Sequence, residues 1–263
     1  MRPAEQEVLY NRFQRIHGAS QPALAQAHVD LIGCGGLGGE VGHGLVRKGV
    51  GHLTLCDHDH VEVSNLPRQQ FDATDIGKPK ALALARNLAR QATGPSLIEG
   101  YAYSFQDALA KGLKLEGQIA VVGVDNNATR IHAAQYYLAR AVPVLFLAVD
   151  VQAARGYVFV QTSQPGHPCF QCLYPDAPND PRIYGCAGAS IEILKIMAGL
   201  ALYAIDSLLM ARARPWNYKA VFLDQGGDGQ RTIGQRPTCS LCGGGTIDGV
   251  QENRTVQLEL SHA

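Results

Sequence analysis

The sequence lacks an excess of charge of either sign. Its 23 Lys and Arg residues balance its 23 Asp and Glu residues, so the formal net charge is zero. Because no global field would draw such a chain to nucleic acid or to an anionic membrane, we expect neither as a partner. An anionic ligand would have to be held by a local site. Charged residues make up 17% of the chain against 46% hydrophobic residues, which excludes a disordered protein.

The chain also lacks an uninterrupted hydrophobic run of membrane-spanning length. Residues 1–15 are polar and charged, without the apolar core of a signal peptide. The most hydrophobic stretch, residues 191–210, is interrupted by Glu192, Lys195 and Asp206, which are too many charges for a helix that crosses a bilayer. We therefore expect a cytoplasmic protein.

Cysteine is scarce and irregularly spaced, with seven residues in the chain. An odd and uneven set does not fit the disulfide framework of a secreted protein. Four of the seven form two Cys-x-x-Cys pairs, Cys169 with Cys172 and Cys239 with Cys242. Four thiolates suit a closed tetrahedral zinc site, in which no ligand position stays open for catalysis. We therefore predict a structural Zn²⁺ that ties the end of the chain back to the loop following the sheet.

Short apolar segments alternate with helical patterns through the first half of the chain. The strand-like segments are residues 27–33, 52–57, 96–101, 119–124 and 144–149. The helical segments are residues 36–48, 78–92 and 127–140. Strands and helices that alternate at this spacing form a parallel sheet with helices on both faces. We predict an α/β fold with a doubly wound, mainly parallel, Rossmann-like sheet.

The pattern changes after Asp150. There we expect antiparallel strands at 157–161 and 220–223, a Pro- and Gly-rich segment at 165–188, and a long helix at 190–212 with Ser190 as its N-cap. The glycine-dense tail at 226–249 is predicted to be mostly loop. Because no internal repeat or low-complexity linker divides the sequence, we predict one domain over residues 1–263. Its parts are an N-terminal helical arm (1–26), a nucleotide-binding half (27–150), and a half with the antiparallel strands, crossover loop, long helix and zinc module (151–263).

A glycine-rich turn, GCGGLG at residues 33–38, follows the first predicted strand. Glycines let the backbone turn tightly and bring the N–H groups of a helix start against phosphate oxygens. Asp57 ends the next strand, where a carboxylate accepts hydrogen bonds from a ribose. On the glycines alone, NAD would be the commonest occupant. The glycines of this predicted nucleotide site are Gly33, Gly35, Gly36 and Gly38.

Two cations follow on the same edge of the predicted sheet. Arg68 and Lys80 come from the loop and the helix start that follow Asp57. A hydride-transfer site has no need for several cations there, whereas a triphosphate does. Asp125 follows the strand at 119–124, and a carboxylate beside a polyphosphate is the expected ligand of Mg²⁺. The set therefore favours ATP with Mg²⁺ over NAD.

The segment Cys56, Asp57, His58, Asp59 and His60 also looks like a metal cluster in one dimension. Side chains alternate along the end of a strand, so these five cannot all converge. We therefore do not predict a metal ion at this segment.

The run GCGGLG…DHDHVEVSNLPRQ…GKPK…VDNNATR resembles the ubiquitin-activating superfamily, in its bacterial MoeB/ThiF branch. The similarity extends from Tyr10 to the last cysteine pair. It implies an enzyme that uses Mg-ATP to adenylate the C-terminal glycine of a ubiquitin-like protein. The resemblance also agrees with the structural zinc.

The resemblance implies roles for particular residues. Asp57 would hold the ribose, the ATP phosphates would be gripped by Asn65, Arg68 and Lys80, and Asp125 would serve the metal and the reaction centre. We place Asp59 in the same nucleotide-binding set. Arg12 matches the family arginine that reaches the ATP site of the partner protomer, which implies a homodimer.

Cys186 lies in the glycine-rich loop just before the predicted long helix. A thiolate near a helix N-terminus is favoured by the positive end of the dipole and could attack the acyl-adenylate to form a thioester. The resemblance supports this role, because a cysteine at the matching position forms the covalent link in several relatives. The alternative is a small buried residue in a tight loop.

The stretch 184–192 departs from the Gly-Val-rich stretch of the biosynthetic relatives. It leads us to expect a bacterial ubiquitin-like conjugation pathway, with transfer to a ubiquitin-conjugating-type carrier protein. The alternative is activation of a ThiS/MoaD-type sulfur carrier for thiamine or molybdopterin synthesis. Two alternatives of other classes are an NAD-dependent Rossmann oxidoreductase and a non-catalytic scaffold that keeps the fold for binding.

Overall fold

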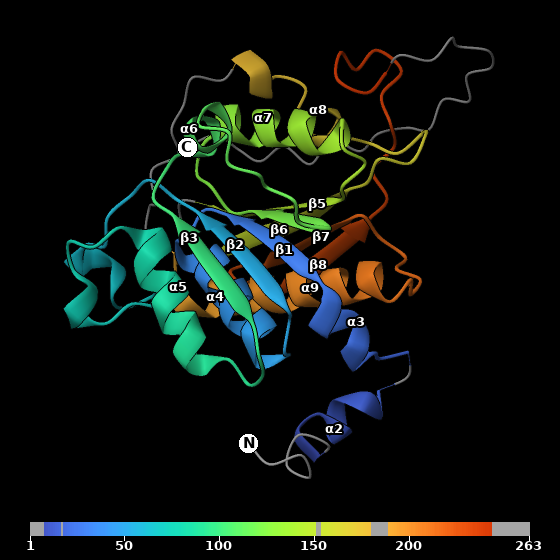
Figure 1. Cartoon of the computed structure of the whole chain (residues 1–263). Coiled ribbons are helices and arrows are strands. Elements are labelled where there is room, and N and C mark those ends of the chain that lie inside the picture. Colours follow the sequence, from blue (N-terminus) through green and yellow to red (C-terminus); the bar gives the residue numbers. More distant parts are fainter. Residues whose placement is uncertain (1–7, 17, 151–153, 180–188, 244–263) are drawn as a thin grey trace.

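One mixed sheet forms the centre of the structure, a computed structural model that describes residues 8–16, 18–150, 154–179 and 189–243 (Figure 1). Its strands are β1 (His28–Ile32), β2 (His52–Cys56), β3 (Leu97–Tyr101), β4 (Ile119–Val122), β5 (Val144–Val149), β6 (Arg155–Gln161), β7 (Tyr218–Phe222) and β8 (Gly227–Arg231). The eight strands lie in the order β3-β2-β1-β4-β5-β6-β7-β8.

The first five strands pair in parallel, which confirms the predicted Rossmann-like half. Every residue of β4 and the first four residues of β5 are buried, as expected for strands covered by helices on both faces. The strand order reverses between β1 and β4. In an open α/β sheet, ligands bind outside the carboxyl ends of the strands at such a reversal. The topology therefore points to the ends of β1 and β4 as the place for a site.

The other three strands extend the sheet by antiparallel pairing of β5 with β6, β6 with β7 and β7 with β8. The tail predicted to be mostly loop contains a strand, β8, which pairs with β7 over Gly227–Arg231. The sequence of β8, GDGQR, has no apolar alternation. Its strand state therefore comes from the ladder hydrogen bonds to β7, which a sequence pattern does not reveal.

Helices cover both faces of the sheet (Figure 1). The helices α4 (Gly36–Arg47), α5 (Lys80–Gln91) and α9 (Ile191–Leu209) pack on one face, and α6 (Phe105–Ala110), α7 (Asn127–Leu138) and α8 (Phe170–Leu173) on the other. Ser190 is the N-cap of α9 as predicted, because its side chain accepts from the N–H of Ile193. None of the described helices is long and apolar enough to cross a membrane.

Two short helices, α2 (Asn11–Gln14) and α3 (Gln21–Gln26), precede the sheet in the segment predicted as an N-terminal arm. The Tyr10 hydroxyl lies 2.6 Å from the Thr93 Oγ1, and the Lys48 Nζ lies 5.4 Å from the centre of the Phe13 ring. These contacts hold the arm against the loops at the amino-terminal end of the sheet, the end opposite to the carboxyl ends of β1 and β4.

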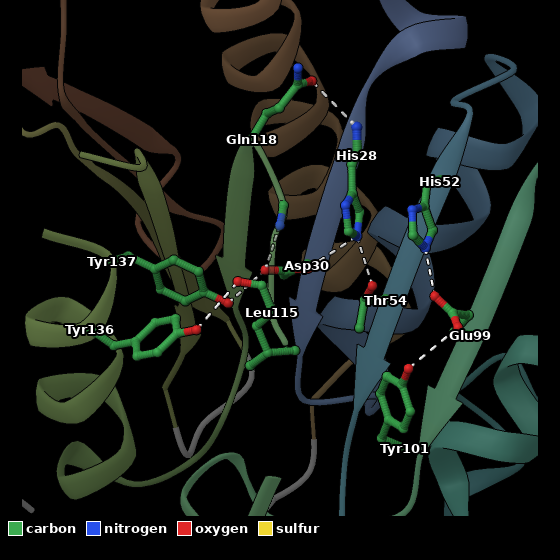
Figure 2. Close-up of polar contacts among 11 residues, drawn as sticks. His28, Asp30, His52, Thr54, Glu99, Tyr101, Leu115, Gln118, Tyr136 and Tyr137 are labelled. Atoms are coloured by element: carbon green, nitrogen blue, oxygen red, sulfur yellow. Dashed lines mark hydrogen bonds and ion pairs between the residues drawn. The ribbon is translucent and has the colours of Figure 1, made fainter. Parts of the chain in front are cut away.

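A polar cluster lies across the amino-terminal halves of β1 and β2 (Figure 2). The rings of His28 and His52 stack, with their centroids 3.6 Å apart. The fully buried Asp30 carboxylate accepts hydrogen bonds from the N–H of Gly117 at 3.0 Å and from the Tyr137 hydroxyl at 2.9 Å. Asp30 thereby joins β1 to the segment before β4 and to α7.

Candidate functional site

The glycine turn after β1 has two positions where a residue with a Cβ would not fit. Gly33 has φ of +95°, a left-handed conformation that a residue with a Cβ adopts only with strain. A Cβ on Gly38 would lie 1.9 Å from the carbonyl oxygen of Gly33. The first turn of α4 therefore sits directly on the end of β1. Its N–H groups face the carboxyl edge of the sheet, as a phosphate site requires.

A cleft lies at this edge, at the carboxyl ends of β1, β2, β4 and β5, where the topology places a ligand. Most of the predicted nucleotide-site residues line it. These are Gly33, Gly35, Gly36, Asp57, Asp59, Arg68, Lys80 and Asp125. Gly38 supports the turn from behind without lining the cleft.

Asp57 is held in place by two backbone groups. Its carboxylate accepts from the N–H of Cys34 at 2.6 Å and from the N–H of Asp59 at 2.8 Å. Burial raises the pKa of Asp57, although these two hydrogen bonds and the charge of Lys80 act against that rise. The carboxylate is therefore held beside the glycine turn. There it can accept a hydrogen bond from a ribose hydroxyl.

The Lys80 ammonium is buried at the start of α5 and donates to the Asp59 Oδ2 at 2.9 Å. Burial alone would raise the pKa of Asp59, but the hydrogen bond and charge of Lys80 outweigh it and hold that pKa below its usual value. The half-buried Arg68 guanidinium donates to the Ser64 carbonyl. Two cations thus line one cleft, the arrangement that a polyphosphate needs.

Asp125 lies in the turn between β4 and α7 with its side chain exposed. Within the described part of the chain, the one contact of its carboxylate is a long 3.5 Å approach from the Asn126 Nδ2. Its oxygens are therefore open to a ligand. A carboxylate with open oxygens, in a cleft that Arg68 and Lys80 also line, has the donor chemistry that Mg²⁺ prefers.

Three of the five side chains from Cys56 to His60 do converge, although the alternation of a strand predicted that the five would not. The ligand atoms of Asp57, His58 and Asp59 all lie within 4.8 Å of one another. They come together because β2 ends at Cys56, after which the side chains no longer alternate. Asp57 already accepts two N–H groups and Asp59 already binds Lys80, so these carboxylates have partners without a metal.

Two predicted site residues, Asn65 and Arg12, do not line the cleft. Asn65 is buried in a 3₁₀ turn, where its side chain accepts from the N–H of Glu62. Arg12 is exposed on α2, and this helix lies at the end of the sheet opposite to the carboxyl ends of β1 and β2 (Figure 1). Cys186 lies outside the residues that the structure describes.

Several residues that line the cleft were not predicted. Thr129 and Arg130 belong to the VDNNATR run, and Gln69 ends the SNLPRQ run. Both runs were already assigned to the nucleotide site, so these three residues could have been predicted from them. Ser104 and Phe105 follow β3, and the rule that ligands bind at the carboxyl ends of strands could have found them. The residues in question are Gln69, Ser104, Phe105, Thr129 and Arg130.

The four predicted zinc ligands meet at one place. The Sγ atom of Cys169 lies 3.9 Å from that of Cys172 and 3.5 Å from that of Cys239, and the Sγ atoms of Cys172 and Cys242 are 3.4 Å apart. Four sulfurs at about 2.3 Å from a tetrahedral Zn²⁺ would be about 3.8 Å apart. The cluster therefore fits zinc.

The surroundings of the cluster favour a thiolate at one of the four cysteines, Cys172, whereas its hydrogen bond to Cys172 and burial raise the pKa of Cys169. Hydrogen bonds from the Cys169 thiol and from the backbone N–H of Arg236 help to lower the pKa of Cys172 to about 4. A thiolate is the form of cysteine that binds zinc. Cys169 starts α8 and Cys239 lies beyond β8, so a bound ion would join these two distant segments, as the spacing predicts.

A ThiF family model matches residues 9–248, nearly the whole chain. The chain belongs to the ThiF family. It is 29% identical over 241 residues to the sulfur carrier protein adenylyltransferase of Thermus thermophilus, covering 85% of this chain and 84% of that protein. It is 30% identical over 255 residues to the molybdopterin-synthase adenylyltransferase of Escherichia coli, covering 91% of this chain and 98% of that protein.

Two further comparisons complete the family assignment. The adenylyltransferase and sulfurtransferase MOCS3 of Sus scrofa is 30% identical over 242 residues, and this chain spans 50% of its length. Among solved structures, Escherichia coli MccB superposes with a TM-score of 0.76 at 20% identity, over 94% of this chain and 75% of that chain. At that identity the likeness shows the fold alone.

Proposed function

We propose that this chain adenylates the C-terminal glycine of a ubiquitin-like protein of the sulfur-carrier type, at the expense of ATP. The observation that carries the proposal is the cleft at the reversal of strand order. It combines a glycine turn, the two cations Arg68 and Lys80 and the open carboxylate of Asp125. Relatives that match over most of their length are named as adenylyltransferases of sulfur carriers and of molybdopterin synthase.

The residues of the cleft account for the chemistry of this reaction. A carboxylate oxygen of the partner attacks the α-phosphorus, the bond to the bridging oxygen breaks, and pyrophosphate leaves with the electron pair. Arg68, Lys80 and the N–H groups at the start of α4 bind the phosphates and offset the negative charge that grows during the attack. Asp125 would hold Mg²⁺, which would supply further charge neutralisation when bound. Asp57 orients the ribose.

Two classes of partner were open at the level of sequence. The conjugation pathway with a carrier protein rested on the stretch 184–192, most of which lies outside the described residues. The named relatives instead favour the sulfur-carrier alternative. We therefore propose a ThiS/MoaD-type protein as the substrate. A thioester at Cys186 stays a separate prediction.

The cations argue against the other classes of function. An NAD-dependent oxidoreductase needs no pair of buried and half-buried cations beside its glycine turn, and a non-catalytic scaffold has no reason to keep an open carboxylate beside them. Further parts of the proposal are a structural Zn²⁺ at the four cysteines, and a homodimer in which Arg12 serves the partner's site.

The direct test is ATP–pyrophosphate exchange with a purified sulfur-carrier protein ending in Gly-Gly. We expect exchange that depends on both Mg²⁺ and the partner, and that is abolished when the terminal glycine is removed. A partner from a conjugation pathway serves as the comparison. If neither protein supports exchange while NAD binds and is reduced, the adenylation proposal is wrong.

A further inference from the structure

A buried cation occupies the first turn of α7, where a cation is unfavourable. Arg130 is 8% exposed and lies three residues after Asn127, the first residue of the helix. The positive end of a helix dipole destabilises a cation there, and burial adds a desolvation cost. Among the described residues, no carboxylate forms an ion pair with its guanidinium, and its Nε lies buried without a hydrogen-bond partner.

The hydrogen bonds of Arg130 go to the two sides of Asp125. Its Nη2 donates to the carbonyl oxygen of Val124 at 2.7 Å, and its Nη1 donates to the Asn127 Oδ1 at 3.2 Å. The Asn126 side chain caps the helix by accepting from the N–H of Thr129 at 2.8 Å. The backbone on both sides of Asp125 is therefore held, and Arg130 supplies the contact that spans the turn.

The Asp125 side chain has no comparable support of its own. It is exposed, and its contact within the described residues is the long approach of Asn126. The direction in which its carboxylate points is therefore set by the backbone of the turn. A catalytic carboxylate has to be held within about 0.5 Å of its working position, which makes the support of this turn a functional matter.

We propose that Arg130 is the positioning residue for Asp125: it fixes the turn that aims the carboxylate at the metal of the proposed adenylation site. The inference rests on the proposed function, because it assigns Asp125 to the metal. It explains why a charged residue stands where a neutral one would be less costly. It also explains why the residue is arginine, since only the planar guanidinium can bridge two acceptors in this way.

The first measurement is metal binding without turnover. Mn²⁺ is titrated by electron paramagnetic resonance into the protein saturated with a non-hydrolysable ATP analogue. Arg130→Lys keeps the charge but loses the planar guanidinium that donates to two acceptors. We therefore expect the Mn²⁺ affinity of this variant to fall about tenfold or more, as happens when an outer-shell partner of a metal ligand is removed. The matched control is Arg140→Lys, an exposed arginine in the turn just after the same helix, which should bind Mn²⁺ like the wild type.

A double-mutant cycle separates positioning from general damage. In an Asp125→Asn background, Arg130→Lys should weaken Mn²⁺ binding no further, because the carboxylate it serves is gone. The same loss in both backgrounds, or an unchanged affinity of the single Arg130→Lys variant, would overturn the inference. If Arg130→Lys does not fold, Asn127→Ala removes one acceptor of the same guanidinium. It should weaken Mn²⁺ binding in the same direction, and an unchanged affinity there would count equally against the proposal.

Failure of this inference is distinguishable from failure of the proposed function. A wild-type protein that binds the analogue with Mn²⁺ but never exchanges pyrophosphate would refute adenylation and leave the link between Arg130 and Asp125 measurable. Conversely, exchange by the wild type with the same Mg²⁺ dependence in Arg130→Lys would keep the function and remove Arg130 from it.

Discussion

At the scale of single residues, Lys80 meets two demands with one ammonium group. It is buried, and it pairs with the Asp59 carboxylate at the rim of the cleft. Asp59 is half exposed and can turn away, so the ammonium can exchange this partner for a phosphate oxygen. The pair keeps a buried cation satisfied in the absence of nucleotide and leaves it available when nucleotide binds.

This arrangement gives a prediction for Lys80→Ala. Removal of one preorganised charge from a phosphoryl-transfer site lowers the rate by about 10²–10³, so partner-dependent pyrophosphate exchange should fall by that factor. Lys114→Ala, which removes an exposed lysine away from the cleft, is the control and should exchange at the wild-type rate. Equal rates for Lys80→Ala and the wild type would show that the cation is not used.

Asp30 gives a prediction about pH. Burial raises the pKa of Asp30 from 3.8 to about 6, so its charged form is less favourable in the folded chain than in the unfolded one. The stability it contributes is complete below pH 3.8 and is lost as the pH rises through 6. Asp30→Asn keeps the acceptor for Gly117 and Tyr137 without the charge. It should therefore raise the free energy of unfolding at pH 7 by an amount of the order of 2 kcal/mol.

His28, in the same cluster, makes a contribution to stability with the opposite pH dependence. Burial and the neighbouring His52 lower the pKa of His28 from 6.5 to about 4, so its contribution is present above pH 6.5 and is lost as the pH falls through 4. Urea denaturation of wild type, Asp30→Asn and His28→Asn between pH 4 and pH 8 separates the two. A gain for Asp30→Asn that is as large at pH 4 as at pH 8 would contradict the assignment.

At the scale of elements, the joint between β1 and α4 depends on contacts that only glycine permits. A Cβ at Gly38 would lie 1.9 Å from the Gly33 carbonyl oxygen, and backbone cannot move aside as a side chain would. A Cβ at Gly199, on the exposed side of α9, meets nothing within 4 Å.

These two glycines make a matched pair for a test by alanine. Gly38→Ala should lower the melting temperature by several degrees and abolish ATP binding, because α4 must shift off β1. Gly199→Ala should leave ATP binding intact and raise the melting temperature slightly, since alanine favours a helix by about 1 kcal/mol over glycine. Calorimetry with and without ATP measures both, and ATP binding by a folded Gly38→Ala variant would refute the prediction.

The zinc module is the second element-scale prediction. Elemental analysis of the reduced protein should find one zinc per chain, and Cys242→Ser should lose most of it because three thiolates remain. Cys56→Ser changes a buried cysteine outside the cluster and should keep its zinc. Absence of stoichiometric metal in the wild type would show that the four cysteines are a thiol cluster only.

At the scale of the whole molecule, each site is predicted to be completed by the partner protomer. Arg12 is exposed on an arm at the end of the sheet opposite to its own cleft, so the proposed role in adenylation would be at the site of another chain.

Complementation in trans tests this arrangement. Arg12→Ala and Lys80→Ala should each be nearly inactive as homodimers. A heterodimer of the two, isolated through different tags, has one site with every residue intact and should recover about half of the wild-type activity. A heterodimer as inactive as its parents would exclude an arginine shared across the interface.

Much of this protein could be inferred from local pattern. Apolar runs and glycines at fixed spacing predicted the parallel half of the sheet and the turn at residues 33–38. The same logic brought Arg68, Lys80 and Asp125 together, because parallel strands place all their carboxyl ends on one edge. The two Cys-x-x-Cys pairs likewise predicted that the four cysteines lie together, since such pairs suit one tetrahedral ion.

Only the tertiary structure decided what depends on contacts between distant segments. β8 is a strand because it forms backbone hydrogen bonds with β7. The Asn65 side chain accepts from the N–H of Glu62 within its own turn instead of lining the cleft. The bridge that the Arg130 guanidinium makes between Val124 and Asn127 likewise exists only in the folded chain. A sequence pattern reports which side chains one element buries. The partners of a polar group are set by the three-dimensional packing of several elements, which the pattern does not contain.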